Sequence, residues 1–412
     1  MVRSPRSLEG IPLITPAHIR SVPATYIVLA SRALLGPRGQ EIDNPAVLIA
    51  DGRIEWIGVR GRCPYLVTSG VSVIDLDGST LVPGLIDCHV HLAFDGGPDP
   101  QTRVRSALPE AQLGVMLRNA QSLLRAGVTT ARDLGAPAHL DIAIRELLRS
   151  GAASGPRLLV AGRPITTRRG HCWFMGVECS DSDAIRKSVR EEVNAGVDLI
   201  KIMVSGGFLT EGSAPWQSQF DADQVRAAVA EAHSAGLPTA AHVHGAESIS
   251  IAVEAGVDTL EHCSFLQPNG RMLYCRTLGK AIAEADIAVC PTVNCNSQGY
   301  EAAWWEDVTE VTSALRGEGV TLVAGTDAGV DGVPHGEYVA GLKMLQESGM
   351  TPSEVLEAAT VKAAGAVGLE SVTGRLDVGL EADILAVEGD PLADIGALSA
   401  IRQIILRGRL LY

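Results

Sequence analysis

The feature that most constrains this chain is a regular alternation of short apolar segments with helical segments between residues 85 and 329. Each apolar segment has the length and the Val, Ile and Leu content of a buried strand, and helical stretches such as 109–127 and 221–236 separate them. Strands that alternate with helices build a parallel sheet. The expected strands are 85–91, 127–134, 156–166, 197–204, 238–244, 258–263, 287–293 and 321–329.

Eight such units in one run predict an α/β fold of the (β/α)8 TIM-barrel type over residues 83–372. The alternative is an open, doubly wound sheet. That fold would carry a Gly-rich phosphate loop after its first strand, and the sequence after residue 91 has none. Several helical stretches end in Ala-Gly just before the next strand, which is a helix-stop signal.

The two ends of the chain read differently from the middle. Residues 25–82 and 373–412 are rich in Val, Ile and Leu and are broken by Gly and Asp-Gly turns, a pattern typical of strands. We therefore expect one small β-sandwich domain built from both termini. Residues 1–24 lack the compact apolar core of a signal peptide, and we interpret them as an N-terminal extension.

Composition narrows the classes of partner. The formal net charge is −14, which argues against nucleic acid as a partner because phosphate binding needs a basic face. No run of about 18 apolar residues is present, so we expect no membrane span. The eight cysteines are scattered, which is typical of reduced thiols in a cytoplasmic protein.

Residues that can bind metals stand towards the C-terminal ends of five of the expected strands, the first, fourth, fifth, sixth and eighth. His89 and His91 alternate at the end of the first, so both imidazoles share one face. The fifth and sixth strands end in the pair His242 and His244 and in Glu261-His262, and the eighth ends in Asp327. Each of these residues alone could be structural, for example a buried histidine with its hydrogen bonds made. Together they lie at the C-terminal end of the strands, where the active sites of barrels are found. We assign no role to His18, His139 and His233.

Lys201 lies inside the apolar fourth strand, where an ammonium group is costly to bury. One interpretation is a lysine at the strand edge whose charged end reaches solvent. The other is a neutral amine, which can react with CO₂ to give a carbamate whose two oxygens bridge two cations.

These motifs resemble the amidohydrolase superfamily. The matching segments are VPGLIDCHVHL at 82–92, LIKIMVSGG at 199–207, AAHVHG at 240–245, LEHC at 260–263, AGTDAG at 324–329 and GLEADILAVEGDPLADI at 379–395. They occur in the order of that superfamily and span the chain from about residue 25.

The resemblance implies two divalent metals, with zinc expected from the imidazole-rich ligand set. His89, His91 and Asp327 would hold the more buried metal, and His242 and His262 the more exposed one. Carboxylated Lys201 would bridge them together with a hydroxide, which attacks the scissile carbonyl. Asp327 would also be the catalytic residue, taking the proton of that hydroxide and passing it to the leaving amine.

Within the superfamily, the motifs are similar to the Xaa-Pro dipeptidases, prolidase-like carboxypeptidases and ochratoxin-type amidases, which cut small N-acyl amino acids or dipeptides. The resemblance implies that His171 contacts the substrate carboxylate. The two preceding arginines, Arg168 and Arg169, depart from the Gly-Gly-His of these relatives, and Arg169 would add carboxylate affinity if it faces the pocket. The further substrate-binding candidates are Trp216, His244 and His335.

Two alternatives stay open from the sequence. The same scaffold supports ester or lactone hydrolysis and deamination, although the superfamily's deaminases typically use one metal and lack a lysine at the fourth strand. A non-catalytic scaffold is the other alternative, but such relatives lose ligands, and here each ligand position is filled. We expect a small-molecule substrate and, because related enzymes are often multimeric, a homo-oligomer.

Overall fold

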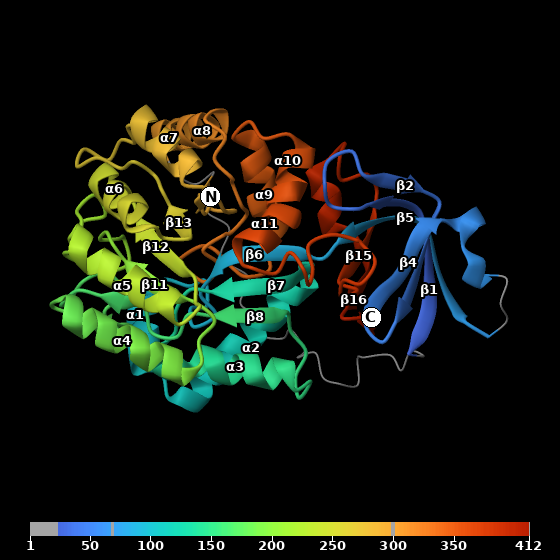
Figure 1. The fold of residues 1–412 in the computed structure, drawn as a ribbon, viewed down its shortest axis with the longest axis horizontal. Helices are drawn as coiled ribbons and strands as arrows, with labels where there is room; N and C mark the ends of the chain where they lie inside the picture. The colour runs from blue at the N-terminus through green and yellow to red at the C-terminus, as the bar shows by residue number, and fades with distance from the viewer. Residues whose placement is uncertain (1–23, 67–69, 298–300, 412) are drawn as a thin grey trace.

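The computed structural model describes residues 24–66, 70–297 and 301–411. It shows an α/β protein with two parts, a larger one of parallel strands and helices and a terminal β-sheet that joins both ends of the chain (Figure 1). The expected N-terminal extension and His18 lie outside the described residues, apart from Ala24.

The terminal sheet has eight strands, in the order β17-β16-β15-β5-β1-β3-β4, with β2 also paired to β1. The long strands β1 and β5 run parallel at its centre. Its strands are β1 (Thr25–Leu34), β2 (Glu41–Asp43), β3 (Pro45–Ala50), β4 (Arg53–Val59), β5 (Ser72–Pro83), β15 (Ile384–Glu388), β16 (Ile401–Leu406) and β17 (Arg409–Leu411).

Both faces of this sheet are covered by apolar side chains. Along β1, Tyr26 and Val28 belong to one buried cluster, while Ile27 and Leu29 belong to another that includes the half-buried Trp56. This is the period-2 alternation of a strand. The expected terminal β-domain is thus present, but where the sequence predicted a β-sandwich its strands form one hydrogen-bonded sheet. Its residue boundaries stay predictions.

The parallel strands of the larger part form two sheets. One has the order β6-β7-β8 and the other β10-β9-β11-β12-β13-β14. Their bounds are β6 (Leu85–Val90), β7 (Val128–Asp133), β8 (Arg157–Val160), β9 (Ile165–Thr166), β10 (Val177–Glu178), β11 (Ile200–Met203), β12 (Thr239–Val243), β13 (Thr259–His262) and β14 (Ala288–Cys290).

The expected closed ladder of eight strands is found only in part. The predicted strand 156–166 is divided into β8 and β9, because Gly162 at φ +66° and Pro164 interrupt it. In the predicted strand 321–329, only Leu322 and Ala328 of the described residues form β-bridges, to Val289 and Val90. This segment thus links the two sheets by isolated contacts, so the barrel is not a continuous sheet.

Eleven α-helices are present in the described residues. The Ala-Gly signals act as expected, since α4 and α6 end at Gly196 and Gly256, both with positive φ. The helices are α1 (Pro100–Ser106), α2 (Pro109–Arg125), α3 (Leu140–Arg149), α4 (Ser182–Ala195), α5 (Ala222–Ser234), α6 (Ala246–Ala255), α7 (Arg276–Glu284), α8 (Ala302–Gly317), α9 (Tyr338–Glu347), α10 (Pro352–Ala358) and α11 (Val361–Ala366).

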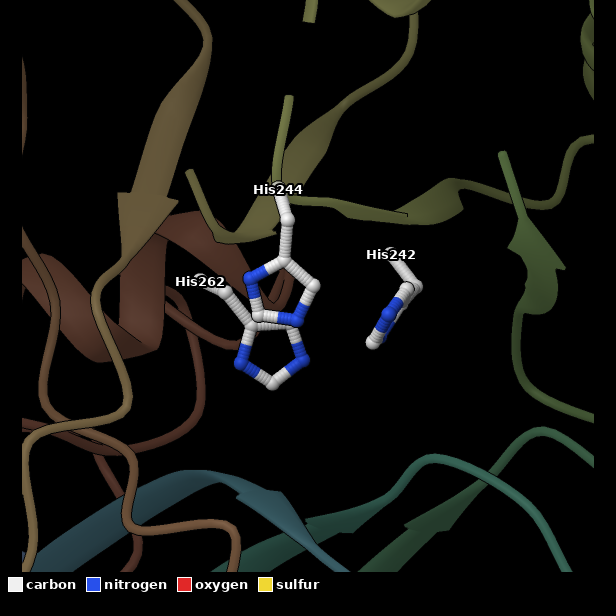
Figure 2. A group of neighbouring side chains, drawn as sticks. All are labelled: His242, His244 and His262. Carbon is white, nitrogen blue, oxygen red and sulfur yellow. The ribbon is translucent and has the colours of Figure 1, made fainter. Parts of the chain in front are cut away.

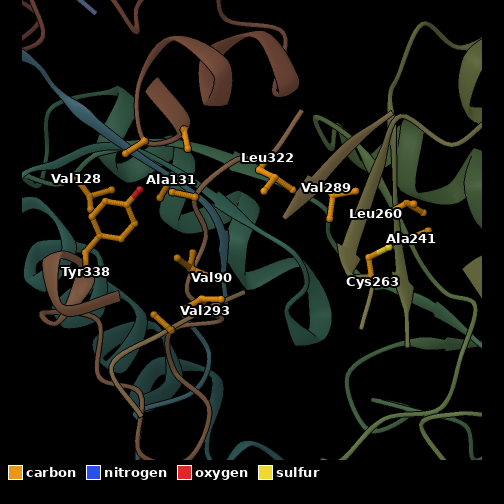
Figure 3. Packing of buried hydrophobic residues seen from close by; sticks show 14 of the residues in the cluster. Val90, Val128, Ala131, Ala241, Leu260, Cys263, Val289, Val293, Leu322 and Tyr338 are labelled. Atoms are coloured by element: carbon orange, nitrogen blue, oxygen red, sulfur yellow. The ribbon is translucent and has the colours of Figure 1, made fainter. Parts of the chain in front are cut away.

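One large apolar cluster connects the strands with the helices around them. Val90, Val128, Leu260 and Val289, from four of the parallel strands, are completely buried in it (Figure 3). Strands covered on both faces lose the simple in–out alternation, which is why they read as nearly continuous apolar runs. Within the described residues, no helix combines the length and apolarity needed to cross a membrane. All eight cysteines are free thiols.

Candidate metal centre

Two imidazoles and a carboxylate meet at the C-terminal end of β6. His89 lies in β6 and His91 follows it, so strand alternation puts both rings on one face. The Nε2 atoms of both rings lie 3.4 Å from Oδ1 of Asp327, which belongs to the segment 321–329. One possible ligand atom from each residue lies within 4.8 Å of the others, so the group can hold a cation.

Three more imidazoles meet at the ends of β12 and β13. His244 and His262 are stacked, with ring centroids 4.6 Å apart, and His242 lies 4.8 and 4.5 Å from them (Figure 2). The sequence assigned His244 to substrate binding, and its ring lies in this second group, which could hold a metal, so its role stays a prediction. The His262 ring also lies 5.1 Å from the His89 ring, so the two groups form one continuous centre.

Lys201 and His171 border this centre. The Lys201 side chain is 1% exposed, and burial lowers the pKa of its amine to about 8. His171 follows β9, and its ring centroid lies 4.4 Å from that of His242. The structure thus brings the candidate bridging residue and a candidate substrate contact to the same place as the imidazoles.

Several buried polar atoms in this centre have no hydrogen-bond partner among the described residues. They are Nδ1 of His91, Nδ1 of His171, Nζ of Lys201 and Oδ1 of Asp327. Leaving one buried polar atom unpaired costs about 1–3 kcal/mol. Four of them in one place indicate a site built for a ligand, and imidazole nitrogens with a carboxylate oxygen fit a divalent metal such as zinc.

Burial also sets the protonation state of these ligands. It lowers the pKa of His91, His171 and His244 to about 3, so these imidazoles are neutral at pH 7 and available to metals. Burial alone would raise the pKa of Asp327, but the neighbouring His89 outweighs it and holds that pKa below its ordinary value. Asp327 is therefore a carboxylate.

A buried ion pair behind His89 orients its ring. Glu261 Oε2 lies 2.9 Å from Nδ1 of His89, and Glu261 Oε1 accepts a hydrogen bond of 2.7 Å from Arg132. Arg132 also donates to the Cys88 carbonyl at 2.7 Å. A carboxylate on the second ring nitrogen fixes the tautomer of a metal-binding histidine. Sequence analysis gave Arg132 no role, although an arginine inside a buried strand is a usable signal.

Asp87 joins the backbone of two ligand-bearing segments. It accepts hydrogen bonds from the backbone nitrogens of His89 and Thr326 at 3.1 Å and from the Thr326 hydroxyl at 2.7 Å. Burial raises its pKa to about 7. These bonds join Asp87 to Thr326 across 239 residues of sequence and so hold His89 next to Asp327. Asp87 was not among the residues that the sequence indicated as functional.

Two glycines allow the backbone to approach the centre closely. A Cβ on Gly207 would lie 2.3 Å from the His171 ring, and a Cβ on Gly325 would lie 2.4 Å from the Cys290 sulfur. Both distances are too short for non-bonded carbon. Gly207 therefore lets the loop after β11 lie against the imidazoles, and the next residue, Phe208, places its ring 5.3 Å from that of His244.

The remaining substrate-binding candidates lie in different settings. Arg169 is exposed, and its guanidinium lies 5.8 Å from the Trp173 ring. Trp216 is half-buried, and its backbone packs beside Gly245. His335 is buried, with Nε2 donating to the His91 carbonyl at 3.2 Å, so it lies behind a metal-binding candidate. Their contacts with substrate stay predictions.

Two histidines without an assigned role have acidic neighbours away from the centre. His139 Nε2 lies 2.7 Å from Glu192, and the partly exposed His233 lies 2.9 Å from Asp258.

The comparison with protein families decides to which family the chain belongs. The model of the amidohydrolase family matches residues 80–411. The chain belongs to the amidohydrolase family. It is thus an enzyme of a family that acts on carbon–nitrogen bonds, as the sequence motifs predicted.

Individual relatives within the amidohydrolase family give a finer picture. Ochratoxinase from Aspergillus niger is 28% identical over 428 residues, covering 92% of this chain and 85% of its own. A crystal structure of a Xaa-Pro dipeptidase with methionine bound in the active site has a TM-score of 0.83 and 26% identity, covering 94% of this chain and 99% of that one. A prolidase complexed with N-methylphosphonate-L-proline has a TM-score of 0.82 and 25% identity, with the same coverage of both chains.

Proposed function

We propose that this chain is a binuclear metal-dependent hydrolase that cleaves an amide or peptide bond of a small substrate, an N-acyl amino acid or a dipeptide-like molecule. The observation that carries the proposal is Lys201. Its amine is buried, has no hydrogen-bond partner among the described residues, and interacts electrostatically with both His89 and His242. A mononuclear site has no need of a lysine at this position.

The ligand assignment follows the two groups of side chains. His89, His91 and Asp327 would hold one metal ion, and His242 and His262 would hold the other. Zinc suits such a set of ligands and is the ion to use in the tests. When bound, two divalent cations acidify a shared water and polarise the scissile carbonyl.

Lys201 would join the two groups after modification. The lowered pKa leaves a larger share of its amine uncharged than in a solvated lysine. An uncharged amine attacks CO₂, forms an N–C bond and releases one proton, which leaves a carbamate with two oxygens. This modification replaces a buried amine, which has no hydrogen-bond partner in the part of the chain that the structure describes, with an anion that suits a site for two cations.

Asp327 would move the proton during the reaction. Its carboxylate is ionised, so with one oxygen on the metal the other could accept a proton from the attacking water. The same carboxylate would then deliver the proton to the leaving nitrogen. A positioned acid–base group of this kind contributes about 10²–10⁴-fold to the rate.

Substrate recognition would come from the residues around the centre. We assign the substrate carboxylate to His171 and place Trp216, His244, Arg169 and His335 among the substrate-binding residues. The likeness to a Xaa-Pro dipeptidase, a prolidase and ochratoxinase supports a small substrate with an amide bond. We also propose a homo-oligomer, which light scattering of the purified chain would test.

The first test is the metal content together with the state of Lys201. We expect about two divalent ions per chain, and a mass increase of one CO₂ on the peptide containing Lys201 under conditions that preserve carbamates. One ion per chain with an unmodified lysine would refute the binuclear proposal.

Substitution of Lys201 tests the bridge directly. We expect Lys201→Ala to lose at least one of the two ions, and bicarbonate with a short carboxylic acid to restore part of the metal content. Lys362→Ala, at a half-exposed lysine near Glu357, is the matched control and should keep both ions. Full retention of both ions in Lys201→Ala would show that no carbamate bridge exists.

The substrate class needs a hydrolysis screen of the zinc-loaded chain. The panel is N-acyl amino acids with Xaa-Pro, Xaa-Arg and aromatic dipeptides, and a parallel panel of esters, lactones and amino-substituted heterocycles. Cleavage of amides supports the proposal, whereas turnover confined to the second panel would favour ester or lactone hydrolysis or deamination.

A further inference from the structure

A cavity of about 410 Å³ lies at the opposite end of the barrel strands from the metal centre. Its lining comes from α3, from the starts of β8 and β11 and from the turn between β16 and β17, so it belongs to both parts of the molecule. Its size is within the range of small-molecule sites. The charged residues that line it are Arg145, Glu146, Arg149, Arg157, Asp198 and Arg407.

Most of these charges are paired with one another or with neighbours. Asp198 contacts Arg145 at 2.7 Å, and Glu146 contacts Arg149 at 2.6 Å and Arg145 at 3.1 Å. The two carboxylates of the lining are therefore already engaged. An anion entering the cavity would meet guanidinium groups and few competing free carboxylates.

The guanidinium group of Arg157 also has close partners, because two carboxylates and a hydroxyl group contact it. Its Nη2 contacts Glu381 at 2.5 Å and Asp383 at 2.9 Å, and its Nη1 donates to the Thr130 hydroxyl at 2.6 Å. These bonds use donors on both terminal nitrogens of its guanidinium and tie the barrel to the terminal sheet.

Arg407 differs from the other three arginines. Within the described part of the chain, the only ion pair of Arg407 is a contact of 3.8 Å between its Nε and Oε2 of Glu381. Arg157 already contacts that same oxygen. The Arg407 side chain is only 35% exposed. Burial, followed by the nearby charge of Arg157, lowers its pKa. Arg407 thus presents a charged donor group to the cavity without a close acceptor.

The backbone at Arg407 gives a second, independent observation. Arg407 and Gly408 form the two-residue turn of the β16–β17 hairpin, with φ of +49° and +68°. Such turns favour Asn, Asp or Gly at the first position, because other side chains are strained at positive φ. An arginine here costs the fold some stability, so we infer that its side chain has a use other than making the turn.

We propose that this cavity is a binding site for a small oxyanion, such as a sulfate, phosphate or carboxylate group, with Arg407 as its principal donor and Arg149 and Arg145 beside it. The guanidinium group suits this ligand because it offers two parallel donors to two oxygens. The ligand would bridge α3 of the barrel and the turn of the terminal sheet. The site is separate from the metal centre and does not depend on the proposed reaction.

The test is isothermal titration calorimetry of the zinc-loaded chain with sodium sulfate and, separately, with succinate, at constant ionic strength. The decisive variant is Arg407→Asn, since Asn suits the turn and should fold at least as well as the parent chain. We expect saturable binding of at least one probe to the parent chain. The affinity of Arg407→Asn for that probe should be at least about tenfold lower, the loss expected for a charged hydrogen bond.

A matched control removes an arginine away from the cavity. Arg190 is exposed on α4 and contacts Glu231 at 3.2 Å, and Arg190→Asn should bind the probes like the parent chain. Thermal unfolding without added probe should give Arg407→Asn a Tm equal to or above that of the parent chain. Equal affinities in the parent chain and Arg407→Asn, or no saturable binding of either probe to the parent chain, would overturn the proposal.

Discussion

The two ends of the barrel strands use charge in opposite ways. At the C-terminal ends, buried imidazoles, a lysine and a carboxylate leave several polar atoms without hydrogen-bond partners among the described residues. At the N-terminal ends of β8 and β11, arginines and carboxylates of α3 and the terminal sheet pair closely, as Arg157 does with Glu381 and Asp383. The first region has the incomplete pairing of a ligand site, and the second has the complete pairing of a structural contact, except at Arg407.

This difference teaches how to separate function from stability within one molecule. Both regions bury charge, which costs free energy unless each group is paired. Where pairing is complete and touches no candidate metal ligand, a substitution should change the free energy of unfolding alone. Where pairing is incomplete, it should also change ligand binding or turnover.

The largest effect is expected at Asp327. Asp327→Asn keeps the size and one oxygen of the side chain but cannot accept the proton, so kcat should fall by about 10²–10⁴ while zinc content is retained. Steady-state kinetics with metal analysis of the same sample measures both. Asp223→Asn, at an exposed carboxylate of α5, is the matched control and should keep the parent kcat. Normal turnover of Asp327→Asn would rule out its role as proton carrier.

A pair of substitutions sharpens the comparison between the two ends. Glu261→Gln and Asp383→Asn each remove one charge from a carboxylate that contacts a buried arginine, Arg132 or Arg157. Both should lower the free energy of unfolding, by up to about 3–5 kcal/mol where the arginine is left unpaired. Asp383→Asn should cost less, because Arg157 keeps Glu381.

Only one member of this pair should affect the metals. Glu261 also contacts His89, so Glu261→Gln should weaken zinc binding by about 10–100-fold, whereas Asp383→Asn should not. Urea unfolding of the metal-free chains gives the stabilities, and competition with a chelator gives the zinc affinities. Equal zinc affinity in the two variants would contradict the role of Glu261 in orienting His89.

The smallest effect concerns pH. Burial lowers the pKa of His335 to about 4 from an ordinary value of 6.5, so the folded chain keeps it neutral while the unfolded chain protonates it. Its contribution to stability is complete above pH 6.5 and is lost as the pH falls towards 4. Each such proton gives a slope of about 1.4 kcal/mol per pH unit, whereas the arginines of the other end keep their charge throughout.

The variant His335→Gln isolates this contribution. Urea unfolding of the metal-free variant between pH 6.5 and 4.5 gives the free energy of unfolding as a function of pH. Its slope should be smaller than that of the parent chain by about 1.4 kcal/mol per pH unit, which corresponds to one proton. Identical slopes in the two proteins would mean that His335 is protonated in the folded chain.

Sequence by itself determined the features that depend on local periodicity. The alternation of strands and helices gave the α/β class, and the two-residue period of a strand put His89 with His91 on one face. The strand-like ends of the chain gave the terminal β-domain, and the ordered motifs gave the amidohydrolase family. Lys201 was recognisable because a lysine inside an apolar strand is costly wherever that strand lies.

Only the tertiary structure decided which distant residues complete each site. Asp87 holds Thr326 across 239 residues of sequence, and Arg132 reaches Glu261 across 129. The tertiary structure also brought the His244 ring next to His242 and His262 and showed isolated bridges where the eighth strand was expected. The cavity at Arg407 exists only where α3 meets the terminal sheet. The physical reason is that periodicity fixes the direction of a side chain within its own element, while its partners depend on how separate elements pack.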